Sequence, residues 1–184
     1  MDTKNILNIA LIYPGYPPEN ALGGGISTYV QEAARGLSSI GHRVTVISRT
    51  KSATIKPEKD IGVRIIRVPG DPKISKILKF LSFNYFGTVM FSYRVRGILA
   101  NIEKQNGAFD IVEVGDWGAE GFAMLETHKD KLIIRCHTPS FISEKYNPSN
   151  KPNLSNFIKF LEKLIIRNAK YVASPSKSLI NEIK

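Results

Sequence analysis

Six short apolar runs rich in β-branched residues recur along the chain, and most are separated by segments with helical periodicity. The runs are residues 6–13, 43–48, 63–68, 110–114, 132–136 and 171–173. Strands that alternate with helices form parallel sheets, because each crossover helix returns the chain to the same edge. The sequence therefore predicts an α/β fold, a Rossmann-like, doubly wound and mostly parallel sheet with helices on both faces.

The connection between the second and third runs departs from this alternation. Residues 49–62 show no helical period and are barely long enough for a crossover, which leaves parallel and antiparallel pairing of those two runs open. Elsewhere the apolar period predicts helices at 26–40, 74–83, 85–103, 117–127, 154–168 and 176–184. Gly41 and Gly107 are expected to end two of them. Residues 138–153 contain three prolines and are expected to form a surface loop that closes over a site.

Composition narrows the class of protein. A length of 184 residues fits one domain, residues 1–184, and the single Cys136 excludes an internal disulfide and gives no support to a zinc module. The net charge of +10 favours an anionic partner, but no nucleic-acid-binding module is recognisable, so nucleic acid is not expected. No apolar run is long and uncharged enough to cross a bilayer, and the N-terminus lacks a signal-sequence pattern, which favours a cytoplasmic location.

A glycine triplet, Gly23, Gly24 and Gly25, lies between the first run and the first helix. Backbone N–H groups at a helix N-terminus have no partner within the helix, and the helix dipole adds positive potential there. A phosphate or sugar phosphate is therefore the ligand expected at the glycine triplet. The loop matches neither the dinucleotide-binding nor the P-loop pattern, so no NAD or ATP site is expected. The alternative is that the glycines only supply permissive backbone angles.

Two other segments end at the same edge of the predicted sheet, where open α/β sheets bind ligands. His137 follows the run at 132–136 and is placed to contact a sugar hydroxyl or a phosphate oxygen, or else to hold the loop backbone. Asp116 and Trp117 follow the run at 110–114. Asp116 is expected first as a helix N-cap, whereas the Trp117 indole is suited to stacking on a sugar face. His42 and His128 are expected on the surface.

A basic, aromatic-rich stretch at residues 73–96 suggests a membrane contact. Its cations, interleaved with aromatic and aliphatic side chains, are Lys73, Lys76, Lys79, Arg94 and Arg96. Such a pattern is typical of a helix that lies on an anionic membrane. An ordinary helix pair with a solvated charged face is the alternative.

The order and separation of several motifs resemble the N-terminal domain of GT-B glycosyltransferases, specifically the retaining family 4. The motifs are Tyr13-Pro14, Gly23-Gly24-Gly25-Ile26, Gly41-His42-Arg43, Phe109-Asp110-Ile111-Val112-Glu113, Asp116-Trp117-Gly118, Arg135-Cys136-His137-Thr138-Pro139, Asn168-Ala169-Lys170-Tyr171 and Pro175-Ser176-Lys177. In that family two Rossmann-like domains face one another across a cleft. The N-terminal domain mainly holds the acceptor, and the C-terminal domain holds the nucleotide sugar.

The resemblance implies that Gly24 and Gly25 approach the donor diphosphate and that His137, the catalytic candidate, lies against the transferred sugar. The implied acceptor-binding residues are Tyr16, Asp116, Trp117 and Thr138. No cofactor and no essential metal are expected, because helix N-termini and basic side chains replace a cation at the diphosphate.

The sequence lacks the E-x7-E acidic motif and the basic donor-binding residues of the family's second domain. It therefore predicts the acceptor-side domain of a retaining hexosyltransferase, inactive alone, whose missing C-terminal domain holds the donor. The expected substrates are a nucleotide sugar and a glycan or glycolipid acceptor, in polysaccharide or glycolipid assembly at the inner face of the membrane. The alternative is a non-catalytic basic α/β domain that binds a phosphorylated ligand at a membrane surface.

Overall fold

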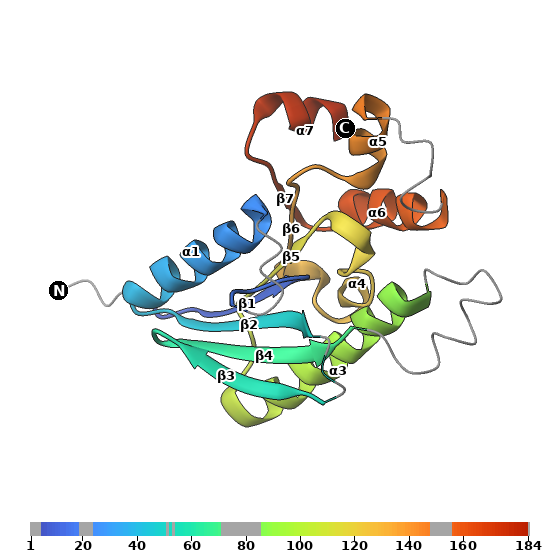
Figure 1. The fold of residues 1–184 in the computed structure, drawn as a ribbon. Coiled ribbons are helices and arrows are strands. Elements are labelled where there is room, and N and C mark those ends of the chain that lie inside the picture. Colours follow the sequence, from blue (N-terminus) through green and yellow to red (C-terminus); the bar gives the residue numbers. More distant parts are fainter. Residues whose placement is uncertain are drawn as a thin grey trace.

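The computed structural model describes residues 5–18, 24–50, 52, 54–70, 86–147 and 156–183. A seven-stranded sheet in the order β3-β4-β2-β1-β5-β6-β7 carries α1 on one face and α3 and α6 on the other (Figure 1). The strands are β1 Asn8–Tyr13, β2 Arg43–Thr50, β3 Lys56–Asp60, β4 Val63–Pro69, β5 Ile111–Gly115, β6 Leu132–Arg135 and β7 Tyr171–Ala173. The helices are α1 Gly25–Ser39, α3 Phe86–Asn106, α4 Met124–Thr127, α5 Ser140–Tyr146, α6 Asn156–Asn168 and α7 Lys177–Ile183, with short 3-10 helices η1 Trp117–Ala119 and η2 Lys129–Lys131.

This sheet confirms the predicted α/β fold, and it settles the pairing left open between the second and third runs. β2 and β4 are parallel, with Val46 opposite Ile65. The antiparallel strand is β3, which pairs with β4 at the edge of the sheet and lies inside the segment where no element was predicted. Its sequence, KPEKD, carries no apolar alternation, because an edge strand gains its hydrogen bonds from one neighbour and needs no buried face on the other side.

The two faces of β1 belong to two core clusters, which is why this central strand reads as a continuous apolar run. The cluster shared with α1 contains Ile9, Leu11, Tyr13, Val30 and Ala34. The cluster shared with α3 and α6 contains Ala10, Ile12, Phe91, Leu99 and Leu161. Burying one such side chain stabilises the fold by roughly 1.5–3 kcal/mol, so these clusters hold both helical layers against the sheet.

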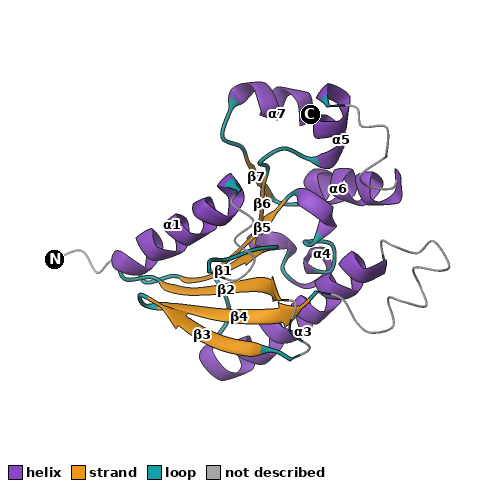
Figure 2. Ribbon diagram, viewed as in Figure 1, coloured by secondary structure: helices purple, strands orange, loops and turns teal. Residues whose placement is uncertain are grey.

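The helical predictions are confirmed in part (Figure 2). Gly41 and Gly107 follow α1 and α3 with φ of 100° and 87°, the left-handed geometry expected at helix ends. The helix predicted at 117–127 is wrong, because the chain is helical only in η1 and α4. The loop predicted at 138–153 contains α5, and its residues 148–153 lie outside the described residues, as does the helix predicted at 74–83.

Among the residues that the structure describes, no helix combines the length and the apolarity needed to cross a bilayer.

Candidate functional site

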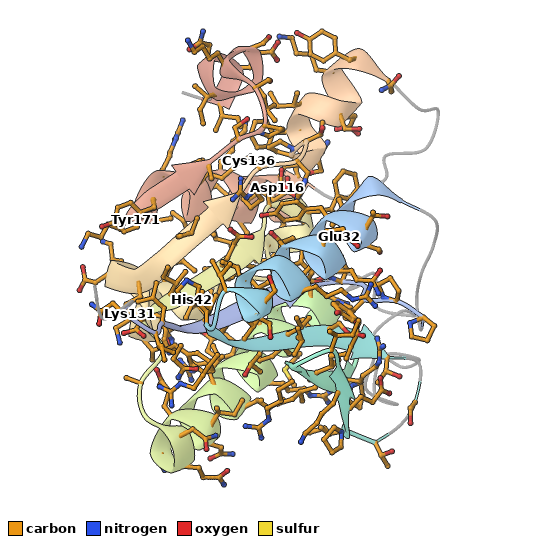
Figure 3. All side chains as sticks on the ribbon, turned by 90° about the vertical axis from the view of Figure 1, so that its left-hand side faces the viewer. Glu32, His42, Asp116, Lys131, Cys136 and Tyr171 are labelled. Carbon is orange, nitrogen blue, oxygen red and sulfur yellow. The ribbon has the colours of Figure 1, made fainter. Side chains whose placement is uncertain are left out.

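The carboxyl ends of the central parallel strands form the edge of the sheet where the candidate residues gather. α1 follows β1, η1 follows β5, and α5 follows β6, so three connections begin at this edge (Figure 1). Figure 3 shows Asp116 and Cys136 at one end of the sheet and His42 at the other. The Nδ1 atom of His42 accepts a hydrogen bond from the Leu7 N–H at 3.2 Å, which gives that histidine a structural role away from the candidate site.

His137 lies between the end of β6 and the start of α5 and faces α1. Its ring makes edge contacts with the rings of Tyr29 on α1 and Tyr13 on β1, with centroid distances of 5.0 and 5.9 Å. The Nε2 atom is buried and has no hydrogen-bond partner among the described residues. Burial, followed by the nearby Arg135 guanidinium, lowers the pKa of His137, so the ring is neutral at neutral pH. A neutral, buried imidazole nitrogen thus lacks a hydrogen-bond partner in the described part of the chain.

A carboxylate beneath His137 orients the two tyrosines that touch it. Glu113 on β5 accepts hydrogen bonds from the hydroxyls of Tyr13 at 2.7 Å and Tyr29 at 3.0 Å, and it pairs with Arg135 at 3.2 Å. Burial and the Glu113 charge raise the pKa of both hydroxyls, that of Tyr29 to about 12, so both remain donors. The sequence prediction missed this network. Its one local signal was a carboxylate inside the apolar run at 110–114.

The N-terminus of α1 lies at the same edge. Gly24 is the N-cap, with extended angles of φ −102° and ψ 150°, and none of the described side chains caps the helix. A Cβ atom added at Gly25 would meet no atom within 4 Å. The described chain therefore imposes no steric need for glycine at position 25. Tyr29 lies one turn after Gly25 and touches His137, which brings the helix start close to the imidazole. Gly23 lies outside the described residues.

Asp116 follows β5 and is only 4% exposed. The N-cap interpretation fails, because its side chain makes no capping hydrogen bond. Neither carboxylate oxygen has a partner of normal hydrogen-bond geometry within the described part of the chain. Burial raises the pKa of Asp116 to about 6, and the backbone N–H groups of His137 and Thr138 act in the opposite direction. Asp116 and His137 are thus neighbouring polar groups with incomplete hydrogen bonding.

The other acceptor candidates differ in their access to solvent. Trp117 is 37% exposed in η1, and Thr138 is exposed with its hydroxyl donating to the carbonyl of His137. Tyr16 is fully buried, and its hydroxyl donates to Asp60 at 2.7 Å. The structure therefore gives Tyr16 a packing role, and we leave it out of the site.

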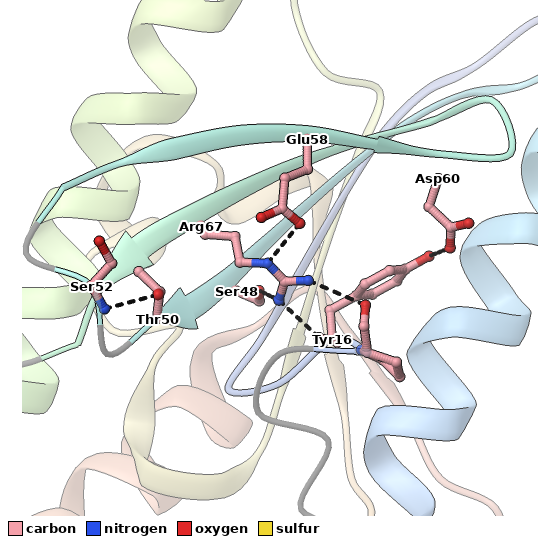
Figure 4. Close-up of polar contacts among 8 residues, drawn as sticks. Tyr16, Ser48, Thr50, Ser52, Glu58, Asp60 and Arg67 are labelled. Carbon is pink, nitrogen blue, oxygen red and sulfur yellow. Dashed lines mark hydrogen bonds and ion pairs between the residues drawn. The ribbon is translucent and has the colours of Figure 1, made fainter.

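Arg67 on β4 anchors the loop that leads from β1 toward α1 (Figure 4). Its fully buried guanidinium donates to the carbonyls of Tyr16 at 2.8 Å and Pro17 at 3.2 Å. It also donates to Ser48 at 3.2 Å and Glu58 at 3.0 Å. β3 thus supplies the counter-ion for a buried arginine.

One of the histidines expected on the surface is enclosed in the fold. His128, expected on the surface, is buried, and its Nε2 atom lies 3.3 Å from the Glu103 carboxylate. Within the described ranges, no group of three or more His, Cys, Asp or Glu side chains is arranged to hold a metal ion.

The sheet order and the open ligand edge define a Rossmann-like domain of the kind that forms one half of a GT-B fold. The model of glycosyltransferase family 4 matches residues 23–184, and the chain belongs to this family. The fold is similar to that of sucrose-phosphate synthase from Thermosynechococcus elongatus, with 18% sequence identity and a TM-score of 0.63. That match covers 90% of this chain and 41% of the related chain, so our chain spans less than half of that protein. No match was found among curated protein sequences.

Proposed function

We propose that the chain is the acceptor-side domain of a retaining hexosyltransferase, which moves a sugar from a nucleotide sugar to a glycan or glycolipid. One observation carries the proposal. The neutral His137 ring has a buried Nε2 without a partner among the described residues, and it lies beside the N-terminus of α1, which no described side chain caps. A hydrogen-bonding imidazole and an anion-binding helix end in one place suit a substrate that joins a sugar to a diphosphate.

In this proposal the backbone N–H groups at Gly24 and Gly25 donate to the diphosphate oxygens. Their partial charge and the helix dipole stabilise the leaving diphosphate, so the reaction needs no cofactor and no essential metal. His137 Nε2 lies against the transferred sugar as the catalytic residue. Asp116 and Trp117, with Thr138, hold the acceptor, with the indole stacked on a sugar face and the carboxylate bonded to a hydroxyl.

The complete enzyme in this proposal has a second domain that binds the donor base and sugar, because our chain spans only 41% of the related structure. The domain by itself then binds a nucleotide diphosphate weakly and transfers no sugar. Family membership supports this reading over the non-catalytic binding domain.

Nuclear magnetic resonance on the isotope-labelled chain tests the site directly. Titration with UDP, GDP or inorganic pyrophosphate should shift the amide signals of Gly24 and Gly25 together with the imidazole signals of His137. Shifts confined to remote lysines would contradict the site. A turnover assay with UDP- and GDP-sugars and a glycolipid acceptor tests the proposed inactivity of the chain alone, which measurable transfer would overturn.

We also propose that the domain contacts an anionic membrane, at the cytoplasmic face, through α6. The stretch expected to do so, 73–96, lies mostly outside the described residues, and its Arg94 and Arg96 bind the Pro69 carbonyl and Glu126. On α6, Phe157 and Phe160 are 55% and 58% exposed. Apolar side chains on a helix face of a basic domain favour the interface of an anionic bilayer.

Cations accompany that face of α6. Lys163 and Arg167 follow Phe160 at helical spacing and line a cavity of about 360 Å³ between α5, α6 and α7. Neither cation forms an ion pair in the described part of the chain, whereas Lys145 in the same cavity lies 3.7 Å from Glu182. The phosphate of an anionic phospholipid is the group that we propose for this position.

A further inference from the structure

A buried carboxylate on α6 joins the two loops of the candidate site. Glu162 is 1% exposed and accepts a hydrogen bond from the Gly118 N–H at 2.9 Å. The same side chain accepts bonds from Ser140, from its N–H at 3.1 Å and from its hydroxyl. Gly118 follows Asp116 and Trp117, and Ser140 begins α5 directly after the segment that contains His137. One side chain thus bonds both loops.

The loop at η1 has a conformation that does not persist without support. Gly118 and Ala119 have φ of 76° and 58°, two consecutive left-handed residues where the sequence predicts a continuous helix. The left-handed conformation is unfavourable for alanine because its Cβ crowds the backbone, and such residues persist where surrounding contacts hold them. In this conformation the Gly118 N–H donates to Glu162. The bond is therefore one of the contacts that hold this left-handed turn.

A buried carboxylate at position 162 lowers the stability of the fold. Burial raises the pKa of Glu162, and its negative charge also raises that of Asp116. Lys159, whose positive charge lowers the pKa of Glu162, is itself paired with Glu144. An apolar side chain of similar volume generally costs the fold no more than a buried charge does. A carboxylate here is explained by the geometry that it imposes on the two loops.

We propose that Glu162 is a positioning residue that sets the spacing between the Asp116–Trp117 loop and the His137–Thr138 loop. It contacts neither donor nor acceptor. Its bonds to Gly118 and Ser140 keep the acceptor-binding side chains and the imidazole at one distance, so that acceptor and transferred sugar meet. The inference rests on the proposed function for its purpose, but the geometric claim can be tested without substrate.

Trp117 is the single tryptophan of the chain, so its fluorescence reports the η1 loop directly. Glu162→Leu keeps the volume but accepts no hydrogen bond, and it should raise acrylamide quenching of Trp117 at least twofold while shifting the His137 imidazole resonances. Glu162→Gln keeps one accepting oxygen and should restore both signals in part. Ser140→Ala removes the hydroxyl bond but keeps the backbone N–H bond to Glu162, so it should shift the His137 signals less than Glu162→Leu does and leave Trp117 quenching unchanged.

Ile166→Ala on the same helix is the matched control. It removes a buried side chain that takes part in neither of the hydrogen bonds to the two loops. It should lower the unfolding midpoint without changing either spectroscopic signal. Glu162→Leu with native-like Trp117 quenching would overturn the proposal, and should that variant fail to fold, an unchanged Glu162→Gln and Ser140→Ala pair would overturn it equally. If the signals change but the complete transferase moves no sugar, the proposed function fails while the positioning role stands.

Discussion

Two clusters of buried ionisable side chains flank the connections from the sheet, and they differ in how completely their hydrogen bonds are made. Around Arg67 the guanidinium meets a carboxylate, a hydroxyl and two carbonyl groups. At the ligand edge, Asp116 and His137 bury polar atoms that have no partner among the described residues. Buried polar atoms are nearly always hydrogen-bonded in folded proteins. The complete cluster therefore stabilises the fold, and the incomplete cluster leaves atoms for a ligand.

The largest effect is expected at the complete cluster. Arg67→Met should lower the free energy of unfolding by about 3–5 kcal/mol, because it leaves Glu58 and two loop carbonyls without their buried donor. Denaturant titration followed by circular dichroism measures it. Arg64→Met, on the same strand but only half-buried, is the control and should cost less than about 1 kcal/mol. Equal costs for the two variants would remove the contrast between the clusters.

A smaller effect of opposite sign is expected at the incomplete cluster. Asp116→Asn should raise the free energy of unfolding at pH 7 by roughly 1–3 kcal/mol, because burial disfavours the ionised carboxylate. The pKa of Asp116 rises from 3.8 to about 6, so the folded state binds the proton more tightly than the unfolded state does. The stability that protonated Asp116 gives the folded state is therefore lost as pH rises from about 4 to about 6.

The advantage of Asp116→Asn should accordingly be absent below about pH 4, grow through that window and stay constant above it. Urea titrations at several pH values measure the difference, with the exposed Asp130→Asn as control. A variant that is destabilised at every pH would show that Asp116 has a structural partner after all.

A substitution at the start of α1 is expected to change stability still less, and to weaken the binding of UDP. Gly25→Ala should raise the free energy of unfolding by about 0.5–1 kcal/mol, since alanine favours the helix and its Cβ meets open space. The same Cβ should weaken UDP binding about tenfold if the diphosphate approaches that backbone. Gly36→Ala, inside α1 and also in open space, should give the same gain in stability with unchanged UDP affinity. Loss of affinity in both variants would point to a general effect of α1.

The smallest effect on stability is expected on the exposed face of α6, at Phe157 and Phe160. The double variant Phe157→Ser and Phe160→Ser should change the free energy of unfolding by less than about 1 kcal/mol, because both rings are exposed. It should abolish sedimentation with vesicles of phosphatidylcholine and phosphatidylglycerol. Ile40→Ser, an exposed apolar residue at the end of α1, should leave vesicle binding unchanged. Undiminished binding of the double variant would exclude α6 as the membrane contact.

Much of the fold was readable from local patterns, and the exceptions have physical causes. The buried strands carry continuous apolar runs because both of their faces pack against helices. β3 escaped prediction because its charged residues form a strand only by pairing with β4 and by placing Glu58 on Arg67. The left-handed turn at Gly118 and Ala119 escaped prediction because one contact that holds it comes from Glu162, 44 residues from Gly118.

The sequence alone determined the parallel sheet, the order of its strands along the chain and the edge where Gly24, Asp116 and His137 come together. Only the tertiary structure decided that Tyr16 is enclosed, that His137 is neutral and that the buried Asp116 carboxylate has no partner of normal hydrogen-bond geometry among the described residues. The physical reason is the sequence separation of the residues that interact. Strand and helix patterns depend on residues a few positions apart, whereas burial and charge at the site depend on contacts such as Tyr13 with Glu113, which are 100 residues apart.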